Sequence, residues 1–266
     1  MTGRIPARAA RLAAAVLATS AVLAAVSGAA GAAVVYNNIP SPLPGNMASW
    51  AFEATQTSEF GGQVELAGTQ RKNPVITVTL SSWACQNLQP GAACKTSGGA
   101  TFEWPITVNV YEVGPGNAPG AKLATQTMTF AIPYRPSASK KCTPNAEGAV
   151  GWGPHCFHGK THNIKFHLSG VTLPTKAIIS VAYNTSDYGY APTHGPDIGQ
   201  NSLNVAVRET AEPGTVVGGQ PTPKDAYLYS VTAAWYCENP GGVNTFAMSK
   251  GCWTGEQPSF EVQAGK

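Results

Sequence analysis

Charged side chains are scarce in this 266-residue chain, at 12% of its residues, and only three of the acids are aspartates. No apolar stripe with the 3.6-residue period of a helix continues for more than two turns. Glycine and proline are abundant, with 29 and 21 residues. Long solvated helices need charged faces, so the composition argues against a helical protein and favours many short strands joined by turns.

The motifs of several enzyme classes are also missing. The chain has no G-x-S-x-G nucleophile elbow, H-E-x-x-H pair, P-loop, G-x-G-x-x-G after a strand, EF-hand loop or C-x-x-C. The two acids of a glycosidase can come from distant strands, so this pairing stays open, with Glu53, Glu59 and Asp187 as candidates. The sequence favours a non-catalytic protein, and the alternative is a hydrolase or lyase acting on polysaccharide.

The N-terminus predicts export. Three isolated arginines in the first eleven residues precede an apolar run over residues 12–26, and small residues follow. This order is typical of a signal peptide covering residues 1–33, with cleavage after Ala32 or Ala33. A retained membrane anchor is the alternative, because the stretch is just long enough to span a bilayer. We expect one domain, residues 34–266, to be secreted to the extracellular space.

The predicted mature chain is formally neutral. Of 17 lysines and arginines, three lie in the signal, and the remaining fourteen match the 14 aspartates and glutamates. Because no basic patch survives, nucleic acid is not a predicted partner, and neither is a membrane after signal cleavage. The oligomeric state is left open.

Six cysteines remain after residue 33: Cys85, Cys94, Cys142, Cys156, Cys237 and Cys252. An even number in an oxidising compartment predicts disulfides. Six cysteines allow fifteen pairings, but the short spacings favour Cys85–Cys94, Cys142–Cys156 and Cys237–Cys252. Each bridge would close a short loop, so we expect the disulfides to staple loops around a separately built core.

Alternation of apolar and polar residues recurs along the chain and indicates strands. Ten runs show it: residues 49–57, 63–67, 75–82, 106–113, 123–132, 163–168, 177–184, 202–208, 226–237 and 259–263. Turn-forming clusters such as residues 114–120 separate the runs. The predicted fold is all-β, an antiparallel β-sandwich of about ten or more strands, jelly-roll-like, with disulfide-stapled loops.

A tyrosine-rich segment follows one predicted strand. Aromatic rings that stack on sugar faces, flanked by groups that hydrogen-bond hydroxyls, are typical of a carbohydrate site, which makes Asp187, Tyr188 and Tyr190 the predicted ligand-binding residues. The ordinary alternative is that Tyr183 belongs to the core and the others cap the edge of the sandwich.

Three histidines, His155, His158 and His162, lie within eight residues. Imidazoles at such spacing can bind zinc or copper. No carboxylate lies within the run to orient the rings, so surface histidines beside a disulfide are the favoured interpretation. We predict no cofactor, and a structural calcium ion in a loop stays open.

Four segments carry a resemblance to known proteins: residues 58–69 (SEFGGQVELAGT), 130–137 (FAIPYRPS), 181–190 (VAYNTSDYGY) and 251–255 (GCWTG). With them the chain resembles a group of uncharacterised secreted bacterial β-sandwich proteins over essentially its whole mature length. It is more loosely similar to surface domains of the choice-of-anchor type, which are jelly-roll modules. The resemblance implies export and the fold, and it transfers no catalytic residue.

The leading hypothesis is therefore a secreted, non-catalytic protein that binds a glycan or another cell-surface ligand, such as the cell wall. A structural or adhesive surface protein is a further alternative to the polysaccharide-acting enzyme.

Overall fold

The computed structural model describes residues 31–87, 94–137, 159–193, 199–209, 216–230, 245–249 and 256–266. They belong to one compact unit, Gly31–Lys266. The predicted signal peptide up to residue 30 lies outside the described residues, as do Cys142, Cys156, Cys237 and Cys252. No helix in these described ranges is long and apolar enough to cross a membrane.

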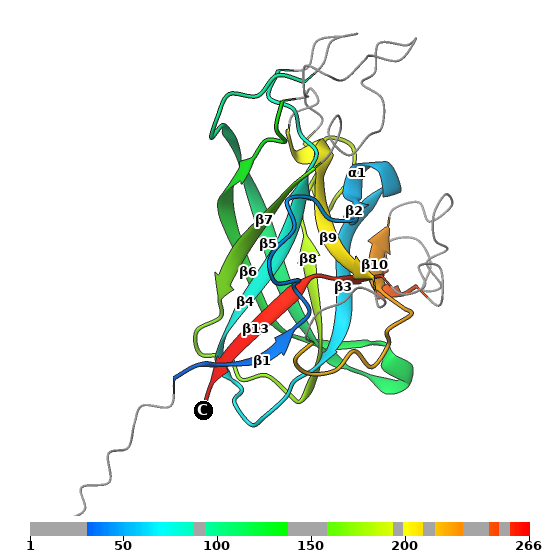
Figure 1. Cartoon of the computed structure of the whole chain (residues 1–266). Coiled ribbons are helices and arrows are strands. Elements are labelled where there is room, and N and C mark those ends of the chain that lie inside the picture. Colours follow the sequence, from blue (N-terminus) through cyan, green and yellow to red (C-terminus); the bar gives the residue numbers. More distant parts are fainter. Residues whose placement is uncertain are drawn as a thin grey trace, which may run out of the picture. The chain divides into compact units, whose positions relative to one another are not determined.

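Two antiparallel sheets pack face to face and confirm the predicted β-sandwich. In Figure 1, strands β4, β7 and β13 lie in front of β5, β6 and β8. The seven-stranded sheet contains β1 (Ala33–Asn37), β13 (Phe260–Gly265), β4 (Lys72–Ser82), β9 (Leu203–Glu209), β12 (Glu256–Pro258), β2 (Ser49–Ala51) and β7 (Lys160–His167). The six-stranded sheet has the order β11 (Ala247–Met248), β10 (Tyr227–Ser230), β3 (Thr57–Glu65), β8 (Lys176–Ala182), β5 (Thr101–Val113) and β6 (Pro119–Pro133).

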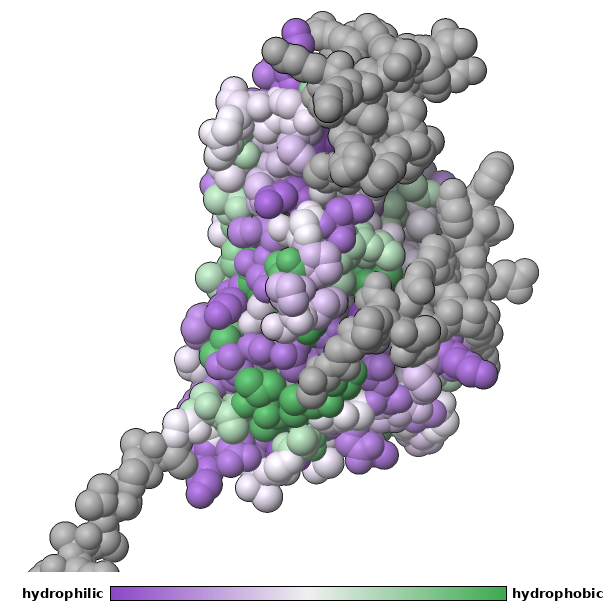
Figure 2. Space-filling view, viewed as in Figure 1, coloured by the Kyte–Doolittle hydropathy of each residue, from purple (hydrophilic) through white to green (hydrophobic). Residues whose placement is uncertain are grey.

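The core lies between the two sheets and follows the alternation of the sequence. Alternate residues in the central parts of β4, β5 and β8 point inward and are buried: Ile76, Val78, Leu80, Ile106, Val108, Val110, Ala177, Ile179 and Val181. Each large aliphatic side chain removed from water contributes about 1.5–3 kcal/mol. On the side of the molecule that carries β1 and β13, Figure 2 shows hydrophilic residues with several apolar areas between them.

The C-terminal segment fills a fork in the seven-stranded sheet, the place where two neighbouring strands diverge. Strands β4 and β9 pair only along Leu80–Ser82 and then diverge. Residues 256–265 enter the gap, pairing first with β9 as β12 and then with β4 as β13. At the branch point, the N–H of Ser259 donates to the carbonyl of Ala206 and its own carbonyl accepts from the N–H of Thr79, both at 3.0 Å.

Asn38, near the N-terminus, stabilises the same fork by hydrogen bonds from its side chain. Its side chain is fully buried, the Oδ1 atom accepts from the N–H of Phe260 at 2.7 Å, and Nδ2 donates to the carbonyl of Pro258 at 3.0 Å. One amide therefore satisfies two buried backbone groups that flank Ser259, where the chain changes its strand partner.

One predicted strand is wrong in part. The run over residues 49–57 forms only the short β2 before α1 (Phe52–Thr55), a single helical turn that ends with Gln56 at φ 55°. Phe52 is fully buried and its ring stacks on Tyr183 with centroids 4.0 Å apart. Burying this aromatic pair outweighs the local alternation, and Tyr183 is a core residue as the alternative interpretation expected.

The loops agree with the turn and cysteine signals where the structure describes them. The predicted turn over residues 114–120 joins β5 to β6 through η1 (Pro115–Asn117), in which Gly116 and Asn117 have positive φ. A second short turn, η2 (Gly199–Ser202), precedes β9. Cys85 and Cys94 form the predicted disulfide.

Replacing Asn38 with alanine is expected to lower the free energy of unfolding by about 2–4 kcal/mol, because two buried backbone groups lose their partners. Urea denaturation of the purified protein measures the loss. Thr69→Ala, at an exposed loop position, is the control and should change the free energy of unfolding by no more than about 0.5 kcal/mol. Equal midpoints for the two variants would contradict this role of Asn38.

Candidate functional site

A glutamate lies buried on the outer face of the six-stranded sheet. In β3, Phe60 and Val64 point into the core, so alternation directs Glu59 to the opposite face, away from the second sheet. An outward carboxylate is normally solvated, yet Glu59 is only 1% exposed. A buried charge is stable only where other groups satisfy it, so its surroundings identify a specialised site.

Four side chains donate hydrogen bonds to this carboxylate. Its Oε1 atom accepts from Asn109 Nδ2 at 2.9 Å, from the Tyr111 hydroxyl at 2.9 Å and from the Ser180 hydroxyl. Its Oε2 atom accepts from the Tyr190 hydroxyl. We call this group the Glu59 cluster: Glu59, Asn109, Tyr111, Ser180 and Tyr190.

The strand register brings these residues together. Glu59 pairs with Ala182 and Asn109 pairs with Ser180, so β3, β8 and β5 run side by side with their outward residues in adjacent rows. Gly61 lies opposite Ser180 in β3, and a Cβ atom there would come within 2.7 Å of the Ser180 Cβ. The glycine therefore leaves room for Ser180 beneath the carboxylate.

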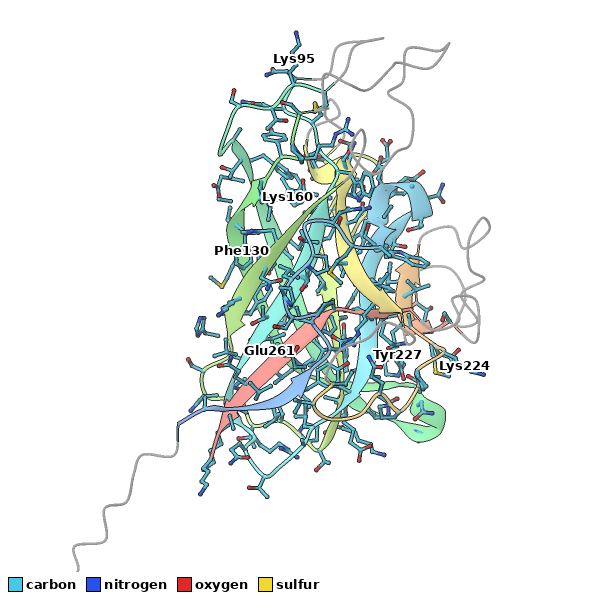
Figure 3. The ribbon with its side chains drawn as sticks, viewed as in Figure 1. Lys95, Phe130, Lys160, Lys224, Tyr227 and Glu261 are labelled. Atoms are coloured by element: carbon cyan, nitrogen blue, oxygen red, sulfur yellow. A yellow bond between two sulfur atoms is a disulfide. The ribbon has the colours of Figure 1, made fainter. Side chains whose placement is uncertain are left out.

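An apolar group closes one end of the cluster. The ring of Phe246 packs against Tyr111, with centroids 5.1 Å apart, and against Tyr227 at 6.0 Å, above the buried side chain of Ile178. The Tyr227 hydroxyl lies 3.0 Å from Gln63 Oε1 and 2.7 Å from the carbonyl of Asn117. Figure 3 shows Tyr227 on β10 near the turn that carries Lys224. This end of the face is packed rather than open.

The opposite end opens to solvent at Tyr190. Tyr190 is 54% exposed as a residue, and its ring makes an edge-to-face contact with Tyr229, with centroids 5.0 Å apart. The loop is tied down by the N–H of Ala191, which donates to Asn184 Oδ1 at 2.9 Å. Gly189 has φ +116°, and a Cβ there would lie 2.4 Å from the same oxygen, so glycine is required. Tyr190 thus covers the carboxylate while presenting its ring to solvent.

The electrostatics keep the tyrosines protonated. Desolvation raises the pKa of both Tyr111 and Tyr190, and the charge of Glu59 and the hydrogen bond to it raise each pKa further. Burial also raises the pKa of Tyr227, to about 12. A phenol with a raised pKa is a hydrogen-bond donor and a poor nucleophile, so the cluster is suited to holding groups in place.

Of the three predicted ligand-binding residues, only Tyr190 belongs to the Glu59 cluster. Tyr190 reaches the Glu59 cluster, whereas Asp187 is exposed and Tyr188 is half-buried, with its carbonyl accepting from the N–H of Thr185 at 2.7 Å. Of the candidate acids, Glu59 lies at the centre of the site, and Glu53 lies on α1. Ligand binding by Asp187, Tyr188 and Tyr190 stays a prediction.

Sequence reasoning missed Asn109, Tyr111 and Ser180. Asn109 and Tyr111 stand at outward positions of a strand whose inward residues are isoleucine and valine, and Ser180 interrupts an otherwise apolar run. The feature that identifies these residues is that they are polar and lie at outward positions of neighbouring strands. Finding it requires the pairing of β5 with β8, which comes from the fold.

Of the three histidines predicted as a possible metal site, the structure describes only His162. His162 lies half-buried on β7, where desolvation and then the charge of Lys160 lower its pKa, and His155 and His158 lie outside the described residues. Among the residues described, no three metal-binding side chains come together. The histidine metal site therefore stays a prediction.

Replacing Glu59 with glutamine is expected to lower the free energy of unfolding by about 3 kcal/mol, because the charge-assisted bonds are lost and an amide NH₂ faces other donors. Chemical denaturation measures the change. Glu103→Gln, at an exposed outward position of β5, is the matched control and should change little. A Glu59→Gln protein as stable as the Glu103→Gln protein would contradict the proposed role of the charge.

Alkaline pH is expected to destabilise the fold through the buried tyrosines. The phenols are protonated in both states below pH 10, the ordinary value, so their stabilising contribution is complete there. Between pH 10 and about 12 the unfolded chain loses phenol protons that folded Tyr227 retains, so stability falls. Titration by phenolate absorbance should show some of the nine tyrosines ionising only near or above pH 12 in the folded protein. A single transition of all tyrosines near the ordinary value, with the fold intact, would contradict the buried network.

Comparison with known proteins gives no assignment: no protein family, curated protein or solved structure matches this chain. The resemblance to secreted bacterial β-sandwich proteins stays an expectation from the sequence.

Proposed function

We propose that this protein is a secreted, non-catalytic binder of an extracellular carbohydrate, and that the ligand lies on the outer face of the six-stranded sheet beside the Glu59 cluster. The cell wall is one source of such a ligand. Export, predicted from the N-terminus, is part of the proposal.

A buried acceptor without a donor carries the proposal. Asn109 is 2% exposed, and its Nδ2 atom donates to Glu59, which fixes the opposite end of the amide as oxygen. That oxygen, Oδ1, is buried and has no hydrogen-bond partner among the residues that the structure describes. Leaving such an acceptor unpaired costs about 1–3 kcal/mol. A sugar hydroxyl is a donor of the right kind to recover this cost when the side chains that cover the oxygen move aside on binding.

The exposed side chains around Asn109 suit a neutral polyol. Thr125 lies opposite Asn109 in β6, and Thr127 lies opposite Thr107 with their hydroxyl oxygens 2.8 Å apart. These hydroxyls both donate and accept hydrogen bonds. The half-exposed ring of Tyr190, on the other side of the cluster, offers an aromatic surface for the apolar face of a sugar ring.

The charge of the cluster favours neutral over acidic sugars. The Glu59 carboxylate accepts only from neutral donors, and the cluster contains no cationic side chain. A uronic acid or another anionic sugar would approach a buried like charge, which is unfavourable. The proposed ligand is therefore a neutral polysaccharide or oligosaccharide.

Binding is tested by retention on insoluble neutral polysaccharides, followed by calorimetry with soluble fragments of those that retain the protein. Tyr190→Ala should weaken binding about tenfold, since an aromatic stacking contact contributes on the order of 1 kcal/mol or slightly more. Tyr190→Phe keeps the ring and should retain most of the affinity. Thr125→Val removes one hydroxyl and should weaken binding about fivefold.

Thr69→Val, at an exposed position of the loop before β4, is the control for Thr125→Val and should bind as the parent does. Two results would overturn the proposal: no retention on any neutral polysaccharide, or binding that Tyr190→Ala and Thr125→Val leave unchanged. Preferential binding of acidic polysaccharides would contradict the assignment of a neutral ligand.

A further inference from the structure

Strand β6 forms an end of the six-stranded sheet. It is 15 residues long and pairs with β5 on one side, and the described residues place no strand on its other side. Lys122 is its one charged residue. A long end strand exposes unpaired backbone donors and acceptors, so its free side is a template for another strand.

The register shows which backbone groups are free. Pairing of β5 with β6 is regular from Thr101 opposite Pro133 to Val110 opposite Ala124, and the N–H of Tyr134 donates to the carbonyl of Ala100 at 3.1 Å in the same register. Hydrogen-bonded and non-hydrogen-bonded pairs alternate in an antiparallel ladder. The even-numbered residues of β6 therefore bond to β5. The odd-numbered residues direct N–H and C=O away from the sheet: Thr125, Thr127, Thr129 and Ala131.

These four residues are all exposed. The stretch from Ala124 to Ile132 contains no proline, charge or bulge, the devices by which sheet edges normally avoid pairing. Toward the second sheet, β6 makes side-chain contacts: Gln126 Nε2 donates to the carbonyl of His167 at 3.2 Å, and the ring of Phe130 packs edge-to-face on Phe166 with centroids 5.0 Å apart. The backbone edge itself stays open among the described residues.

We propose that β6 pairs antiparallel with β6 of a second copy of this chain, about a two-fold axis at Thr127. In this register Thr127 faces Thr127 of the second copy and Thr125 faces its Thr129, so each pair joins residues whose backbone groups point outward. Lys122 faces Ile132 of the second copy, which avoids opposing like charges. The arrangement is isologous and closed, and it extends each six-stranded sheet into its partner.

Cross-strand threonine pairing favours a second copy over an unrelated strand. Thr107 and Thr127 already form such a pair within the sheet, with their Oγ1 atoms 2.8 Å apart. The two-fold register repeats this chemistry across the new boundary, because three threonines of each copy meet three of the other. An uncharged, threonine-rich edge is complementary to itself.

Sedimentation of the purified protein over a concentration series tests the pairing. The parent should form dimers that dissociate on dilution. Thr127→Lys should be monomeric over the same range, because two lysines would face each other at the axis. Thr69→Lys, which adds the same charge at an exposed loop position, is the control and should dimerise as the parent does. An equimolar mixture of Thr127→Lys and Thr127→Glu should recover a heterodimer.

A cross-link tests the register. Facing residues of a hydrogen-bonded pair have Cα atoms about 5.5 Å apart, within the range of a disulfide. Thr127→Cys should therefore give a covalent dimer on a non-reducing gel, and Thr69→Cys should not. A monomeric parent at every concentration, or a dimer that Thr127→Lys leaves intact, would overturn the proposal. Neither measurement involves a carbohydrate, so the outcome is separate from that of the proposed function.

Discussion

The buried carboxylate of Glu59 constrains the six-stranded sheet more than any other single group. A carboxylate removed from water must be satisfied by hydrogen bonds, and here neutral donors do this without a cation. The donors come from β5, β8 and the loop that carries Tyr190. Shifting β5 by one residue would turn two donors to the core side, and shifting β8 would turn one, so the carboxylate would lose those hydrogen bonds. The carboxylate thus specifies the register of β3, β8 and β5 together with the position of the loop.

The sequence predicted the sandwich because alternation is a local property of each strand. The runs that became β4, β5, β8 and β9 bury every second residue, as period-2 patterning requires. The turn of α1 escaped prediction because its cause is the stacking of Phe52 on Tyr183, far apart in the chain. The fork at Ser259 escaped for the same reason: its pairings join residues 79, 206 and 259. Contacts between residues far apart in the chain determine these features, so the local sequence pattern could not predict them.

The candidate site was predictable only at its exposed end. Tyr190 was identified from a cluster of aromatic and polar residues close together in sequence. The donors Asn109 and Ser180 lie 50 and 121 residues from Glu59, and each looks like an ordinary polar position of its own strand. Their role depends on which strands are neighbours. Tyr190 links the two parts, since its hydroxyl bonds to the buried charge while its ring stays in solvent.

The threonines of β6 serve both proposals without conflict, because side chains and backbone groups of a strand point in perpendicular directions. The hydroxyls of Thr125 and Thr127 lie on the outer face, where a sugar would bind, while their N–H and C=O groups lie in the plane of the sheet and face the edge. Pairing through the edge would therefore leave the hydroxyls accessible. It would also bring the outer faces of two copies into one surface. A polysaccharide long enough to reach both sites would then bind the second at a high effective concentration, so a weak single site would suffice for retention on an extended polymer.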